Sequence, residues 1–474
     1  MLWKLKTWIA ITCLCFVSTN SWAALSSAMV WEVRSAGGSV NGCGFKSGAT
    51  GTDYSQQNTA QVAYTDLVID GVETAWLTSA ANPFGAAHVG NILKVTGGTG
   101  FTTGFYEVAS VSGTTATMDR AVGTASSTGG TGNLGGACSH PQDIAPSIVA
   151  GNLIHVKAAT YVKQGANTYV LSLSIAGGNG TLIEWRGYQT TRNDYPASAN
   201  APDFDGATNT TNVLVGAVSN IFKNFLFRRA SGDCLSNVGA YFYILNSRIT
   251  ACGDDGLAGS SVTVNTEVDT NTGAGLDASD ADNHVMNNNY IHDNGAGGAI
   301  SSNSSAGTSA RNTIFDTNTG NGFHAQRVIS FLINNVSYNN SGATADGYNI
   351  DGTTTAALFS AYNNISMSNG RYAFNRDATT NQQPAYFDYN IYNGHTTELN
   401  NVTAGPNDAG DVDPSFTNAA GGDFTFSVST SPAVAAGLSQ SIPGATGDYQ
   451  WNIGVDQDDN TAGGGVTVGY SYGN

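Results

Sequence analysis

The sequence predicts an all-β protein built as a solenoid, in which short strands stack coil upon coil. Three observations carry this prediction. The composition is rich in turn-forming residues, with 59 Gly and 47 Asn among 474 residues. Only 11% of the residues are charged, which is too few for a helical bundle or coiled coil, and 41% are hydrophobic, which argues against disorder. A motif of about 22 residues recurs seven times between Asn224 and Phe374.

The repeat is anchored on an asparagine that recurs at intervals of 22, 19, 23, 24, 22 and 29 residues. Apolar residues stand three and eleven positions after most anchors. A second asparagine stands six positions after the later anchors, and a glycine stands ten positions after the earlier ones. The anchors are Asn224, Asn246, Asn265, Asn288, Asn312, Asn334 and Asn363.

A period of this length is too short for a helix–turn–helix repeat, so each copy is expected to be one coil of short strands. Successive coils would stack about 4.8 Å apart and place equivalent residues above one another. We expect the plus-three and plus-eleven columns to fill the core. We expect the anchor asparagines to form an inward ladder of side-chain amides. Because no coil buries its apolar face alone, stability comes from stacking.

This pattern resembles the right-handed parallel β-helix of the pectate lyase-like superfamily, over residues 144–400. Residues 151–158 look like the opening strand of such proteins. The tail is similar to the ends of many secreted bacterial β-helix proteins, in the motifs Asp413-Pro414-Ser415-Phe416 and Gly422-Asp423-Phe424. The resemblance implies a right-handed parallel β-helix at 144–400, with a C-terminal cap and flexible tail at 401–474.

Residues 24–143 lie outside the repeat and are expected to form an N-terminal β-rich module. Stretches 92–96, 105–108 and 116–119 alternate like short strands, and residues 126–136 read as a Gly/Thr-rich loop or linker.

The first 23 residues read as a secretory signal peptide, with Lys4 and Lys6 ahead of a short apolar run and small residues before Ala23. The run is too short to cross a bilayer, so no membrane insertion is expected. A secreted, extracellular or periplasmic protein is therefore predicted. The net charge of −17 repels nucleic acid phosphates, so no nucleic acid partner is expected.

Four cysteines follow the signal segment, and an even number in an exported protein suggests disulfides. Three pairings are possible. We favour Cys43 with Cys138 and Cys234 with Cys252, because each pair falls within one proposed module.

In the superfamily, carbohydrate sites lie on the strand after the asparagine-rich turns, which implies an extracellular polysaccharide or cell-surface glycan as partner. Here that strand follows the plus-ten glycine. Asp255 and Asp277 belong to adjacent coils and are the candidate acid and base for cleaving a glycosidic bond. The pair Asp254-Asp255 resembles the Asp-Asp element of β-helix polygalacturonases. Asp254, His324 and Arg327 are the candidate substrate contacts.

A lyase of this superfamily would need Ca²⁺ to neutralise a substrate carboxylate. Asp277, Asp280 and Asp282 could offer oxygen ligands for calcium. A second polar column, four positions after the anchors, could serve on another face; it consists of Asp269, His292, Asp316 and Tyr338.

The resulting hypothesis is a secreted β-helix protein that recognises an extracellular polysaccharide, with cleavage by a hydrolase or lyase reaction as its enzymatic form. The alternative is a non-catalytic surface or adhesive protein, or a phage-fibre-like structural protein.

Overall fold

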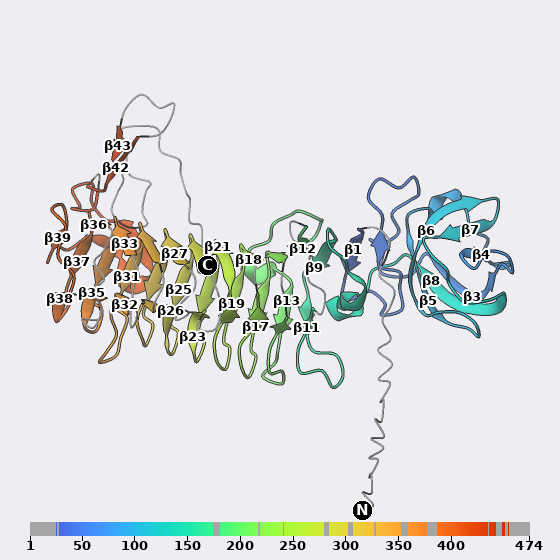
Figure 1. Ribbon diagram of the computed structural model, residues 1–474, viewed down its shortest axis with the longest axis horizontal. Helices are drawn as coiled ribbons and strands as arrows, with labels where there is room; N and C mark the ends of the chain where they lie inside the picture. The colour runs from blue at the N-terminus through green and yellow to red at the C-terminus, as the bar shows by residue number, and fades with distance from the viewer. Residues whose placement is uncertain are drawn as a thin grey trace, which may run out of the picture.

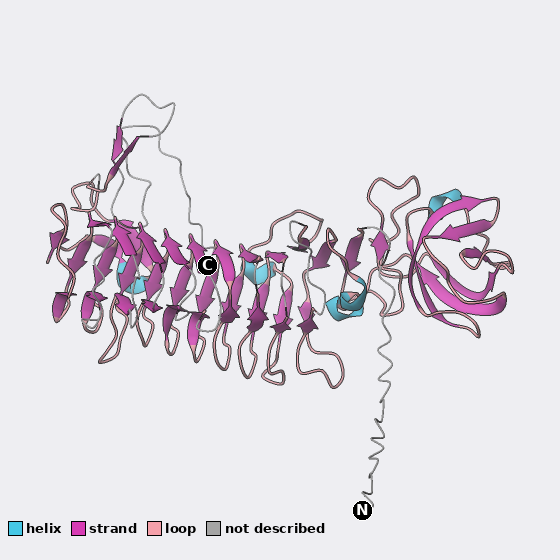
Figure 2. Cartoon of the chain, viewed as in Figure 1, coloured by secondary structure: helices cyan, strands magenta, loops and turns pink. Residues whose placement is uncertain are grey.

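The computed structural model describes most of the chain after the first segment. The described residues are 25, 28–173, 181–216, 219–239, 241–278, 284–301, 307–326, 329–351, 359–376, 386–434, 436–441, 448–450 and 454. A long stack of short strands runs along the molecule, and a small β-barrel lies at its N-terminal end (Figure 1; Figure 2).

Three long sheets make up the stack in the described residues. Sheet 1 consists of β2 (Gly44–Phe45), β1 (Val30–Val33), β9 (Leu153–Lys157), β12 (Ile183–Tyr188), β15 (Asn220–Lys223), β18 (Phe242–Leu245), β21 (Ser261–Val264), β24 (His284–Asn287), β27 (Gly307–Arg311), β30 (Ile329–Ile333), β33 (Phe359–Tyr362) and β36 (Tyr386–Asp388).

Sheet 2 consists of β10 (Thr160–Tyr161), β13 (Asp203–Asp205), β16 (Leu226–Arg228), β19 (Arg248–Thr250), β22 (Glu267–Asp269), β25 (Tyr290–His292), β28 (Ile314–Asp316), β31 (Val336–Tyr338), β34 (Ile365–Met367), β37 (Ile391–Asn393) and β39 (Ala409–Gly410). Sheet 3 consists of β11 (Leu171–Ser172), β14 (Leu214–Val215), β17 (Leu235–Val238), β20 (Leu257–Gly259), β23 (Ala274–Asp277), β26 (Gly297–Ser301), β29 (Phe323–Gln326), β32 (Tyr348–Asp351), β35 (Tyr372–Arg376) and β38 (Thr397–Asn400).

Each coil adds one strand to each sheet, and from β9 onward the neighbours within these sheets pair in parallel. Parallel strands joined by crossovers of this kind are right-handed in nearly all proteins. The pairing confirms the predicted right-handed parallel β-helix.

The two predicted core columns are confirmed by the strand register. The plus-three residues lie on the inner face of sheet 2 and are completely buried; they include Phe227, Ile249, Val268, Ile291 and Phe315. The plus-eleven residues lie on the inner face of sheet 3 and are equally buried; they are Leu235, Leu257, Leu276, Ala299 and Phe323. A single apolar core therefore runs through the stack.

The prediction that the anchor asparagines form the inward ladder is wrong. The anchors adopt left-handed backbone conformations, with φ between 46° and 62°, and they turn the chain from sheet 1 to sheet 2. Asn246 and Asn265 are exposed, whereas Asn224, Asn334 and Asn363 are buried. Along the exposed stretch Asn288 donates to Asn265, and Asn265 donates to Asn246 at 3.0 Å. Asparagine tolerates this conformation better than most residues, which explains its recurrence there.

Buried amide ladders form elsewhere in the coil. One is short, with Asn335 donating to Asn364 at 2.9 Å and Asn364 to Asn390 at 3.0 Å. The longer ladder is formed by the plus-six asparagines. In it the Nδ2 of Asn294 donates to the Oδ1 of Asn318 at 2.9 Å, and Asn318 donates to Asn340 at 2.9 Å. The same bonds join Asn271 to Asn294 and Asn340 to Asn369, both at 2.8 Å. The ladder thus ties five successive coils together.

The N-terminal module is a closed barrel, in the strand order β3 (Val62–Ile69), β4 (Trp76–Thr78), β7 (Thr115–Met118), β6 (Gly104–Ser112), β5 (Ile92–Gly97) and β8 (Ser127–Leu134). The linker expected at 126–136 is wrong, because most of it is strand β8. Its glycines permit close packing: a Cβ on Gly130 would lie 2.4 Å from the Phe101 ring. Short 3₁₀ turns complete the described helical structure: η1 (Ala86–His88), η2 (Pro141–Asp143), η3 (Ala145–Ser147), η4 (Ser198–Asn200) and η5 (Ala419–Gly421).

The barrel and the stack are joined through β1, which pairs in parallel with β9 although it precedes the barrel in sequence. The disulfide Cys43–Cys138 closes this junction, and Cys234–Cys252 joins the turns of two adjacent coils. Both are the favoured pairings. The fully buried Glu32 of β1 binds Arg34 at 2.7 Å and Arg192 at 2.7 Å, which compensates its charge.

The C-terminal segment folds back over the outer face of sheet 2. Its hairpin, β40 (Phe416–Asn418) and β41 (Asp423–Phe426), places Phe424 and Phe426 against an outward apolar column. That column is Ile314, Val336, Ile365 and Ile391. A second hairpin joins β42 (Ser439–Ser441) to β43 (Asp448–Gln450). Among the described residues, no helix has the length and apolar character needed to cross a membrane.

Replacing Asn318 by Ala should lower the free energy of unfolding by about 3 kcal/mol, because several buried groups lose partners. Asn318 also donates to the Ile291 carbonyl at 3.1 Å and accepts from the Asn294 backbone at 3.1 Å. Urea unfolding of Asn318→Ala would measure the loss. The exposed Asn209 is the matched control, and Asn209→Ala should change stability by less than about 0.5 kcal/mol. Equal effects of the two variants would contradict the proposed role of the ladder.

Candidate functional site

Three carboxylates gather where sheet 2 turns into sheet 3, and a fourth lies at the end of a sheet 3 strand in the next coil. Asp233 lies between β16 and β17, and Asp254 and Asp255 lie between β19 and β20, one coil further on. Each of these three offers an oxygen within 4.8 Å of the others. Asp277 ends β23 in the next coil, and its charge acts on both Asp255 and Asp233. The structure therefore brings Asp254, Asp255 and Asp277 together; we call these residues and Asp233 the acidic cluster.

A glycine in the neighbouring coil makes room for the cluster. Asp255 Oδ1 accepts a hydrogen bond from the Ala274 backbone at 2.6 Å. A Cβ on Gly273 would lie 2.3 Å from that oxygen and 2.7 Å from Asp254 Oδ1. The Asp255 backbone in turn donates to Asp233 Oδ1 at 3.3 Å. The cluster is thus positioned by the stacking of three coils.

The electrostatics of the cluster favour a carboxylic acid at neutral pH. Burial, together with Asp277, Asp254 and Asp233, raises the pKa of Asp255 to about 7, although the Ala274 N–H opposes the shift. Burial also raises the pKa of Asp233. Asp254 is exposed and Asp255 and Asp277 are half-buried, so solvent and ligands can reach them. A pKa near the working pH beside other carboxylates is what general acid catalysis requires.

The other predicted site residues fall into two groups. His324 lies on the outer face of sheet 3, two strands beyond Asp277, with Ile300 between them. Burial lowers the pKa of His324, and Asp346 opposes this effect, so the imidazole is neutral at pH 7. Asp280, Asp282 and Arg327 lie outside the described residues.

Sequence reasoning missed the polar network beside His324. Asp346 is fully buried and pairs with Arg371 through two bonds, of 2.8 Å and 2.6 Å. Asn375 donates to Asp346 at 2.8 Å and to Asn349 at 3.1 Å, and Asn400 donates to Asn375 at 2.8 Å. These three asparagines continue the His324 column, and each directly follows a core residue of sheet 3, namely Tyr348, Phe374 or Leu399. That spacing is the signal that could have identified them.

The second polar column occupies the outer face of sheet 2. Tyr290 stacks on His292, with ring centroids 4.0 Å apart, and donates to Asp316 at 2.8 Å. Burial raises the pKa of Asp316 to about 6. Burial lowers the pKa of His292, but bonds to Glu267 and Asp293 outweigh it, and the net pKa is raised.

Three ligand atoms on this face, from Glu267, Asp269 and His292, are close enough together to hold a metal ion. Arg248 argues against that use, because its guanidinium binds both oxygens of Asp269, at 2.8 Å and 2.9 Å. A metal ion at this position would have to displace the Arg248 guanidinium from Asp269. In the acidic cluster, oxygens of Asp233, Asp254 and Asp255 form a second group that is close enough together to hold a metal ion.

No known protein family matches the sequence, and neither does any curated protein. Solved structures of similar build include pectate lyase Pel9A, with 12% identity, a TM-score of 0.45, and coverage of 68% of this chain and 91% of that chain. Another is the A-module of mannuronan C-5 epimerase AlgE6 from Azotobacter vinelandii, with 14% identity, a TM-score of 0.36, and coverage of 57% and 85%. The assignment of the fold rests on the strand pairing described above.

The raised pKa of Asp255 makes stability depend on pH. The pKa of Asp255 in the folded protein lies above its value in the unfolded chain. Its contribution to the free energy of unfolding is therefore fully present below about pH 4 and is lost as the pH rises through about 7. Asp255→Asn should therefore raise the thermal midpoint at pH 8 and leave it nearly unchanged at pH 4. Differential scanning calorimetry at both pH values would measure this. A lower thermal midpoint for Asp255→Asn at pH 8 would contradict the interpretation that the ionised Asp255 is destabilised by burial and by the neighbouring carboxylates.

Proposed function

We propose that this is a secreted β-helix protein that recognises an extracellular polysaccharide and cleaves it at the acidic cluster. The observation that carries the proposal is the acidic cluster itself, in which oxygens of Asp233, Asp254 and Asp255 lie within 4.8 Å of one another, and in which burial and neighbouring carboxylates raise the pKa of Asp255. A carboxyl group with a raised pKa holds a proton at neutral pH and can give it up to a leaving group. Two carboxyl groups, one of them acting as this acid, are the usual requirement for glycoside hydrolysis.

In the proposed reaction, Asp255 donates its proton to the glycosidic oxygen as the bond to the leaving sugar breaks. Asp277 then either accepts a proton from the attacking water or attacks the anomeric carbon itself, according to the separation of the two carboxyl groups in the complex. Asp254 and His324 would contact the substrate, one on each side of Asp277 along the coils. Arg327 follows β29 in sequence and is proposed as a third contact.

The cluster also supports a proposal for calcium. All its candidate ligands are carboxylate oxygens, which Ca²⁺ prefers, and three of them lie within 4.8 Å of one another. Asp277 would join them, with Asp280 and Asp282 following in sequence. In the alternative lyase reaction, on a uronic substrate, a cation here would neutralise the substrate carboxylate, and Asp255 would bind the cation instead of donating a proton.

Two disulfides support the proposal of export, since such bonds persist in oxidising compartments. An extracellular or periplasmic location would place the protein beside polysaccharide. The predicted signal peptide at 1–23 lies outside the described residues.

Asp255→Asn and Asp277→Asn should each lower kcat at least about 100-fold while leaving glycan binding intact, because each removes one acid–base group. The measurement is product analysis after digestion of neutral and uronic polysaccharides, with and without Ca²⁺. The exposed Glu73 of the barrel provides the control, and Glu73→Gln should keep full activity.

Two results would overturn this assignment. Unchanged activity in both Asp variants would remove the catalytic roles. Glycan binding with no turnover by the wild type would favour the adhesive alternative, and a trimer in light scattering without glycan binding would favour the fibre-like one.

Calcium should raise the thermal midpoint of the protein more at pH 8 than at pH 6. Protonation of Asp255 competes with the cation, and its pKa is about 7. Asp254→Asn should weaken the effect, since Asp254 supplies one of the clustered oxygens. An equal shift at both pH values, or none, would argue against binding at this cluster.

A further inference from the structure

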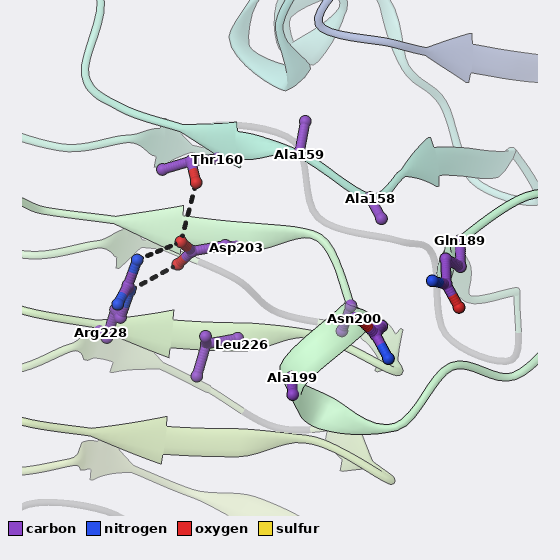
Figure 3. Close-up of a pocket in the computed structure, with 10 residues that line it drawn as sticks. Ala158, Ala159, Thr160, Gln189, Ala199, Asn200, Asp203, Leu226 and Arg228 are labelled. Carbon is purple, nitrogen blue, oxygen red and sulfur yellow. Dashed lines mark hydrogen bonds and ion pairs between the residues drawn. The ribbon is translucent and has the colours of Figure 1, made fainter.

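A cleft of about 550 Å³ lies on the outer face of sheet 2, at the N-terminal end of the stack. Strands β10, β13 and β16 form its base, and the segment that carries η4 overhangs it (Figure 3). The volume suits one or two sugar rings. The cleft is separate from the acidic cluster, although β16 leads directly into the turn that carries Asp233.

The lining has polar groups at two sides and small apolar groups between them. Thr160, Asp203 and Arg228 stand at one side, and Gln189 and Asn200 stand at the other (Figure 3). The apolar part is supplied by Ala158, Ala159, Ala201 and Leu226. A pyranose ring has the same division, because its C–H faces are apolar and its hydroxyls lie around the rim.

The charges of the cleft are already compensated. Arg228 binds both oxygens of Asp203, at 2.9 Å and 2.5 Å, and lies 3.3 Å from Asp205. Thr160 donates to Asp203 at 3.1 Å. A carboxylated sugar would meet an Arg228 whose charge two carboxylates already balance, on a protein of net charge −17. A neutral sugar needs no charge to balance its own.

Hydrogen-bonding capacity remains for hydroxyl groups. Within the described part of the chain, the side-chain amides of Gln189 and Asn200 bind no other protein group. Both side chains are exposed, and each can donate and accept, as a sugar hydroxyl can. Asp203 is 7% exposed, and its arrangement is fixed by Arg228 and Thr160 before any ligand arrives.

From these features we infer that the cleft is a binding subsite for neutral hexosyl or pentosyl units of a polysaccharide. This inference deepens the proposed function by naming the class of sugar. It rests on the proposed function for the cleavage of the bound polysaccharide, whereas binding at the cleft is measured separately. The subsite would anchor the chain on β10, β13 and β16, the last of which belongs to the coil that carries Asp233, the first carboxylate of the acidic cluster.

The test is isothermal titration calorimetry with cellohexaose, xylohexaose, mannohexaose and laminarihexaose, and with hexagalacturonate and hexamannuronate as charged probes. At least one neutral hexasaccharide should bind. Ala199→Trp fills the cleft from an exposed position and should abolish binding. The double variant Gln189→Ala, Asn200→Ala should weaken it about 10-fold, for two lost hydrogen bonds. Asn209→Ala, an exposed amide outside the lining, should bind within two-fold of the wild type.

Binding of uronic probes alone, or neutral binding that Ala199→Trp leaves unchanged, would overturn the inference. Cleavage of uronic probes that Asp255→Asn abolishes, without neutral binding, would leave the proposed function standing. Neutral binding through the cleft without any cleavage would support the subsite and remove the catalytic proposal. Absence of both binding and cleavage for every probe would reject both.

Discussion

Register between coils is the constraint on which the rest of this protein depends, and the buried amide ladder is the interaction that maintains it. An asparagine amide in the core must both donate and accept, and it finds its partners in the neighbouring coils, at the equivalent asparagines and at backbone groups such as the Ile291 carbonyl. A coil displaced by one residue would leave these groups unpaired in an apolar interior. The same alignment governs the outer faces, so the acidic cluster exists because Asp233, Asp255 and Asp277 occupy successive coils held in step.

The core of the fold could be predicted from sequence because stacking repeats the same environment in every coil. Phe227, Ile249 and Val268 are recognisable as one column by spacing alone. The anchor asparagines were misplaced because a left-handed turn and an amide ladder both select asparagine, and spacing does not distinguish them. Strand β8 was read as a linker because its glycines suggest flexibility, whereas their role is close contact across a barrel closed by distant strands.

The same distinction applies to the sites. Asp255 and Asp277 could be paired from their places in adjacent coils, but the pKa of Asp255 depends on burial and on Gly273 in a neighbouring coil. The cleft on sheet 2 escaped notice because Gln189 and Asn200 belong to an irregular connection ahead of the repeat. Arg228 stands four positions after the first anchor, Asn224, and so belongs to the second polar column. The repeat therefore indicates this side of the cleft, but it does not indicate the side formed by Gln189 and Asn200.

The C-terminal hairpin has a consequence for how the chain matures. The column of Ile314, Val336, Ile365 and Ile391 stays open to solvent until Phe424 and Phe426, which follow it in sequence, have been synthesised and have packed on it. A chain interrupted before residue 424 would leave this apolar column exposed on the outer face of sheet 2. Such a product would be open to proteases and self-association. The hairpin therefore covers the last exposed part of this apolar column, and only the chain that has folded through residue 426 buries it.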